Sequence, residues 1–99
     1  MKIKVNIPIL DYDKKPIVDA QTKEPVTYRK VFANALNALQ ENETMTGDQK
    51  TRIYQISLKL YDSDEVDLTV DQMSLIKDRV AKFYTPLLFG RTCELFGDK

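Results

Sequence analysis

The 99 residues suffice for one small domain with a single core, so we expect residues 1–99 to form one globular domain. The 15 basic and 15 acidic residues cancel, which removes the usual electrostatic reason to expect nucleic acid or an anionic membrane as partner. No apolar run reaches the roughly 18 residues of a membrane-spanning helix, and residues 1–8 lack the apolar centre of a signal peptide.

The residue types that usually carry enzyme chemistry are scarce. The chain has no histidine, the commonest general base and metal ligand near neutral pH. Its glycines, at positions 47, 90 and 97, cannot form a phosphate-binding loop. Cys93, the single cysteine, cannot form an internal disulfide and has no histidine to activate it. We therefore expect a non-enzymatic protein without catalytic residues or cofactor, in a reducing cytoplasm.

The N-terminal residues have the pattern of a strand and a turn. Residues 2–10 alternate apolar and polar side chains, which predicts a half-buried strand, with Pro8 placing it at a sheet edge. Residues 11–16 hold two aspartates and a proline and predict a turn. Ile17 and Val18 would return as a short second strand, which makes a β-hairpin.

Two helices are predicted next. Thr27 is a capping residue before an apolar stripe over residues 28–40, and residues 41–45 interrupt that stripe as a loop. Thr46 and Gln49 form a capping box that opens a helix to about Tyr61. Within residues 52–61, Ile56, Leu58 and Leu60 also alternate like a strand, so helix or strand stays open there, although the length and the cap favour the helix. Residues 65–68 would be briefly extended and pair with the N-terminal strand.

The last third of the chain predicts two further helices. Thr69 and Gln72 form another capping box, and one helical face then carries Met73, Ile76, Val80, Phe83 and Tyr84. Thr85-Pro86 closes this helix and starts the next, because proline suits a first helical position. The fold class that follows is α+β, mainly α, with an N-terminal β-hairpin packed beside about four helices.

The final predicted helix, residues 86–96, has little polar surface. A short helix of this kind is either enclosed in its own domain or covered by another chain. We therefore predict an interface for a second copy or another protein here and at the N-terminal strand edge. Its residues would be Leu87, Leu88, Phe89, Cys93, Phe96, Ile3 and Val5.

Two other clusters invite a functional interpretation. The acidic residues Asp62, Asp64, Glu65 and Asp67 lack the glycine and the final glutamate of a calcium loop, so we expect no metal site. Lys77, Arg79 and Lys82 could line a helix face that meets phosphates, but acidic residues lie among them and no aromatic stacking platform accompanies them. A solvated helix face is the expected outcome, and nucleic-acid binding is the less favoured alternative.

Charge is distributed unevenly along the chain. Basic residues exceed acidic residues within residues 1–30, whereas acidic residues exceed basic ones within residues 31–68. These regions could complement each other within one chain or between copies of the chain.

The whole pattern resembles that of small uncharacterised proteins of tailed bacteriophages and prophages. The similar segments are residues 8–17, 27–36, 59–61, 65–69 and 84–90. The resemblance implies a viral origin and a bacterial host cell, and it implies no mechanism. The favoured hypothesis is an oligomeric structural, assembly or adaptor protein of a phage. The alternative is a regulatory or host-directed protein that contacts nucleic acid or a host protein.

Overall fold

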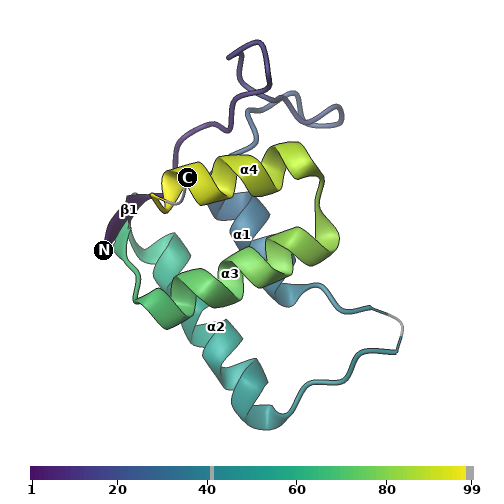
Figure 1. Ribbon diagram of the computed structural model, residues 1–99, viewed down its shortest axis with the longest axis vertical. Helices are drawn as coiled ribbons and strands as arrows, with labels where there is room; N and C mark the ends of the chain where they lie inside the picture. Colours follow the sequence, from purple (N-terminus) through teal and green to yellow (C-terminus); the bar gives the residue numbers. More distant parts are fainter. Residues whose placement is uncertain (41, 98–99) are drawn as a thin grey trace.

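The computed structural model describes residues 1–40 and 42–97. Within them the chain is α+β and mainly helical, which confirms the predicted fold class (Figure 1). The elements in chain order are β1 (Lys2–Lys4), α1 (Tyr28–Asn37), α2 (Gly47–Asp62), β2 (Glu65–Asp67), α3 (Val70–Phe83) and α4 (Pro86–Leu95).

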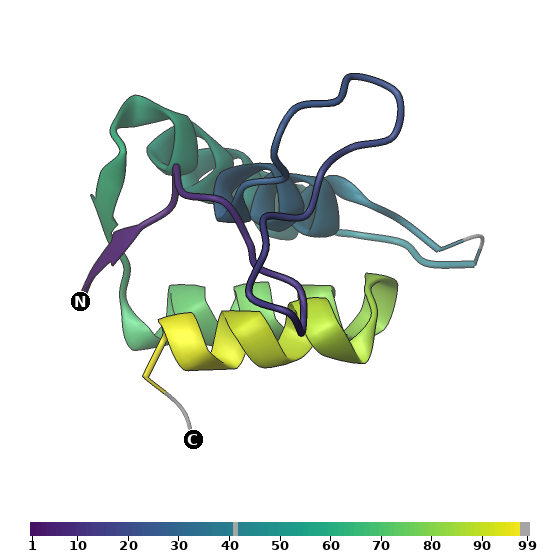
Figure 2. The same ribbon diagram turned by 90° about the horizontal axis from the view of Figure 1, so that it is seen from above.

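The helices form two layers. Figure 2 shows α3 and α4 side by side in one layer, with α1 and α2 in the other and the two short strands at one edge. Helix α1 lies at the centre, because it packs against both α2 and α3. In Figure 1 the first turns of α2 extend to the lower end of the molecule, away from α4.

Each helix begins at the threonine that the sequence predicts. Thr27, Thr46, Thr69 and Thr85 each accept a hydrogen bond from a backbone amide of the first turn. Both predicted capping boxes are formed, by Gln49 and by Gln72. The ambiguity over residues 52–61 is resolved in favour of helix, since the whole segment lies within α2. Glu41, predicted in the loop, lies outside the described residues.

The sheet consists of β1 and β2, which pair antiparallel with Ile3 opposite Val66. The predicted pairing of residues 65–68 with the N-terminal strand is therefore correct.

Strand β1 is shorter than the strand predicted over residues 2–10. The Val5 carbonyl accepts from the Arg29 amide, and this bond directs the chain onto α1. Beyond it, Leu10 and Val18 make isolated antiparallel bridges to Pro16 and Pro25, so the predicted return strand is no regular ladder.

The core fills the space between the two helical layers and the sheet. Phe32 of α1 is fully buried, and its ring lies 5.8 Å from that of Tyr28 and 5.4 Å from that of Phe96. Ile3 and Val66 extend the core under the sheet. In the described part of the chain, no helix has the length and apolar character needed to cross a membrane.

Candidate functional site

Three of the seven predicted interface residues belong to the core of their own chain. Ile3, Val5 and Phe96 are buried, so in the folded protomer they are not offered to a partner. The reason is that β1 packs its apolar side onto the helices, and Phe96 closes the aromatic cluster at the end of α4. Leu87, Leu88, Phe89 and Cys93 are partly buried.

The apolar surface of α4 is largely used within the chain. Leu88, Phe89 and Leu95 pack against the core. On the outer side, the Arg91 guanidinium donates to the carbonyls of Leu10 and Asp11, at 2.9 and 2.7 Å, and so fixes the N-terminal turn against the helix. A shallow cavity of about 290 Å³ remains between Tyr12 and Leu87. Most of the apolar side chains of α4, which the sequence predicts as an interface, therefore pack within their own chain.

The predicted basic face of α3 is not a continuous exposed surface. Arg79 is buried, while Lys77 is partly buried and Lys82 is exposed. Arg79 lies on the same helical face as Ile76 and Val80, not on the solvent face that its charge predicts. The three cations of the nucleic-acid alternative are therefore not brought together toward solvent.

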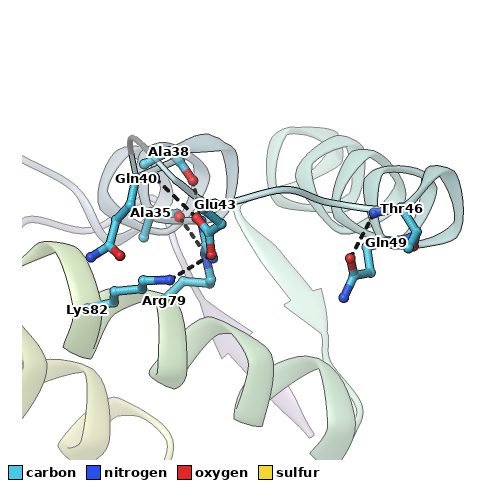
Figure 3. A network of polar contacts seen from close by, with 8 residues as sticks. All are labelled: Ala35, Ala38, Gln40, Glu43, Thr46, Gln49, Arg79 and Lys82. Atoms are coloured by element: carbon cyan, nitrogen blue, oxygen red, sulfur yellow. Dashed lines mark hydrogen bonds and ion pairs between the residues drawn. The ribbon is translucent and has the colours of Figure 1, made fainter.

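Arg79 is held in a network with the segment that follows α1 (Figure 3). Its Nη1 lies 2.7 Å from Glu43 Oε2, its Nε donates to the Ala35 carbonyl at 3.2 Å, and its Nη2 donates to the Ala38 carbonyl. Lys82 Nζ lies 2.6 Å from the same Glu43 oxygen. Bonds from Arg79 and Lys82 lower the pKa of Glu43 from 4.5 to about 2.

This network stabilises the fold, and its polar groups are not free to bind a ligand. A cavity of about 140 Å³ lies beside it, lined in part by Gln49, Arg52 and Arg79. The Arg79 guanidinium already donates to two backbone carbonyls and to Glu43, so its charge and donors are satisfied before any ligand arrives. The network fastens the end of α1 and residue 43 to α3.

The most exposed apolar stripe on a helix lies on α2. Tyr54, Leu58 and Tyr61 are 62%, 54% and 56% exposed. They follow one another at spacings of four and three residues and therefore share one face of the helix. The opposite face carries the buried side chains Ile53, Ile56 and Leu60. Helix α2 thus has two apolar faces, of which the core uses one. We call residues Tyr54, Leu58 and Tyr61 the α2 stripe.

Neighbouring elements border the α2 stripe without covering it. On one side, Asn37 of α1 donates to the Ser57 hydroxyl at 3.1 Å, and the Arg29 guanidinium lies 5.2 Å from the centre of the Tyr61 ring. On the other side, Lys59 donates to Gln72 of α3 at 3.2 Å. These contacts fix the position of α2, so the stripe is presented on a rigid element.

The α2 stripe was not predicted from the sequence, although the spacing of its residues in the sequence indicates it. The strand-like alternation of Ile56, Leu58 and Leu60 arises because Leu58 lies on the outer face, whereas the other two lie on the inner one. The other two members of the stripe are Tyr54 and Tyr61. Their spacing from Leu58 is the helical repeat that would have identified the second face.

The acidic residues after α2 are engaged in structural contacts. Asp64 accepts from Asn6 at 3.0 Å, and Asp67 pairs with the N-terminal ammonium at 2.8 Å, which lowers the pKa of Asp67. Across residues 1–40 and 42–97, no three acidic or cysteine side chains gather as a metal site.

No protein-family model, curated protein sequence or solved structure matches this chain. A functional assignment therefore depends on the geometry of the chain itself.

Proposed function

We propose that this chain is a non-enzymatic phage protein that acts through protein–protein contacts, as an oligomeric structural, assembly or adaptor factor. The observation that carries the proposal is the α2 stripe, an exposed apolar row on a rigid helix. Tyrosine is enriched among residues that dominate interface energies, because it offers a large contact area and fixes few torsions on binding.

The size of the stripe is in keeping with such a role. Its three exposed side chains present on the order of 300 Å² of largely apolar surface. That area is comparable to the largest apolar patch on an ordinary monomer, and such patches are often functional. Both tyrosines of the stripe remain more than half exposed, although the Arg29 guanidinium lies over the Tyr61 ring, on a helix that already buries another apolar face.

The phage assignment and the location come from the sequence. The resemblance to small tailed-phage proteins supports a viral origin, and the single cysteine supports action in the reducing cytoplasm of a bacterial host. Nucleic-acid binding receives less support, because Arg79, one of its three proposed contacts, is buried and paired with Glu43.

Site-specific photocrosslinking in the native cells tests the proposal. A photoreactive phenylalanine analogue replaces Tyr54 in one variant and Tyr12 in another. Tyr12 is also exposed but lies beside α4, so it reports on the interface that the sequence predicts. We expect protein adducts from position 54. Adducts from position 12 alone would move the contact to α4, and no adduct from either position would contradict the proposed function.

A further inference from the structure

We propose that the α2 stripe binds the same stripe of a second copy of this chain, with the two α2 helices antiparallel about a two-fold axis. This inference rests on the proposed function, because it names the partner of the surface described above. It is carried by the spacing of the stripe and by the arrangement of charge along α2.

The face that carries the α2 stripe continues toward the N-terminus of the helix through Thr51. Thr51, Tyr54, Leu58 and Tyr61 lie at alternating spacings of three and four residues, which is the pattern of a seam between two helices. From Thr51 to Tyr61 this seam extends for about 15 Å along α2, which has 16 residues. The seam is thus long enough for helix-against-helix packing and is not a single exposed side chain.

The two ends of α2 carry opposite charge. Lys50 is exposed near the N-terminus, on the side of the helix that carries Tyr54, and the helix dipole adds positive potential there. Asp48 lies in the first turn, where that dipole stabilises it and offsets its charge. Asp62 is exposed in the last turn, four residues after Leu58, where the dipole adds negative potential. Lys59 of the same turn is directed to Gln72 of α3, and Asp64 beyond the helix pairs with Arg29.

This polarity selects one orientation of a pair. Two parallel copies would bring basic ends together and acidic ends together, whereas two antiparallel copies bring each basic end beside an acidic end. Neither Lys50 nor Asp62 has a side-chain ion pair among the described residues, so both are available for such a contact.

The side chains of the seam also fit a two-fold arrangement. Its midpoint lies between Tyr54 and Leu58, so the axis places each Tyr54 against the Leu58 of the other copy. The same operation places the small Thr51 opposite the large Tyr61. A two-fold contact uses the same patch on both copies and closes at a dimer. One pair of helices is a small interface, so we expect a dissociation constant in the micromolar range.

Sedimentation of the purified protein over a concentration series tests the inference through three charge variants. The basic-end variant is Lys50→Glu, the acidic-end variant is Asp62→Lys, and the combined variant carries both changes. Both positions are exposed, so each variant should keep the circular dichroism spectrum of the wild type. We expect either single-end variant to dimerise about tenfold more weakly and the combined variant to recover, because the charges of both ends are then exchanged.

The control separates end-specific contacts from net charge. Lys15→Glu changes the net charge as much as the basic-end variant does, but in the N-terminal turn beside α4. This control should dimerise like the wild type. A wild type that stays monomeric into the millimolar range would overturn the inference, and so would a basic-end variant that is no weaker than the control. If adducts nevertheless form at position 54 in cells with a different protein, the proposed function stands and only the second copy is excluded.

Discussion

The guanidinium of Arg79 and the carboxylate of Glu43 lie 2.7 Å apart, with their side chains 8% and 17% exposed. This pair joins the middle of α3 to residue 43, just before α2, and it is completed by bonds from Arg79 to two carbonyls at the end of α1. A cation placed in this way orders the chain and is not presented to a ligand. Arg79 and Glu43 are therefore structural charges, in contrast to the charged side chains at the surface of this protein.

Replacing Arg79 with methionine should destabilise the fold. The change keeps apolar contact but leaves the Ala35 and Ala38 carbonyls without their Arg79 donors, and it leaves Lys82 as the cation paired with Glu43. We expect the free energy of unfolding to fall by about 3 kcal/mol, as measured by urea denaturation. Lys82→Met is the matched control, because Lys82 contacts the same carboxylate but is more exposed. Equal losses for the two variants would contradict this view of the network.

The same network predicts an acid-dependent stability. Arg79 and Lys82 hold the pKa of Glu43 at about 2 instead of 4.5. Since the folded pKa is the lower one, the stabilisation is complete above pH 4.5 and is lost as the pH falls from 4.5 toward 2. The wild type should therefore lose more stability over this range than Glu43→Gln, in thermal melts followed by circular dichroism. Other carboxylates with lowered pKa values, such as Asp67, titrate in both proteins and cancel in the comparison.

The helical skeleton could be predicted from the sequence because its signals are local. A capping threonine with Gln49 or Gln72 three residues later fixes where α2 and α3 begin, whatever the rest of the chain does. The short β1 was less predictable. Residues 2–10 alternate throughout, but a contact between Val5 and Arg29 ends the regular pairing, and that contact depends on how α1 packs.

The surfaces were predicted less well because their use depends on distant residues. Arg79 has the charge of a solvent-facing residue, and only its pairing with Glu43 makes burial favourable. The apolar side chains of α4 indicated an interface, whereas most of them pack against the protomer's own core. The α2 stripe was missed for a different reason. A helix with apolar residues on two faces resembles a strand in sequence, because its apolar residues then alternate with polar ones.

Two leucines on α2 provide a direct test of its two faces. Leu60 is fully buried, whereas Leu58 is 54% exposed. Leu60→Ala should lower the free energy of unfolding by about 3 kcal/mol, because it removes buried methyl groups and leaves a cavity. Leu58→Ala should change that free energy by less than about 0.5 kcal/mol in dilute solution, where the chain is monomeric. Urea denaturation at low protein concentration measures both, and a large loss for Leu58→Ala would mean that its side chain belongs to the core.

Arg91 should control the mobility of the N-terminal turn. Its guanidinium is the side-chain donor to the Leu10 and Asp11 carbonyls, so Arg91→Ala should release this turn from α4. We expect faster cleavage after Lys14 by a lysine-specific protease, measured by mass spectrometry under native conditions. Arg52→Ala is the control, because Arg52 lies on α2, far from this turn. Equal cleavage rates for the two variants would exclude the anchoring role.

We propose that this protein meets its partner, a second copy, at the outer face of α2. Amide chemical shifts of the isotope-labelled chain, compared between dilute and concentrated samples, locate that contact most directly. We predict concentration-dependent shifts at and around Tyr54, Leu58 and Tyr61, with the amides of Arg91 and Glu94 on α4 unchanged. Shifts confined to α4 and the N-terminal turn, or no shifts up to the highest soluble concentration, would contradict the claim.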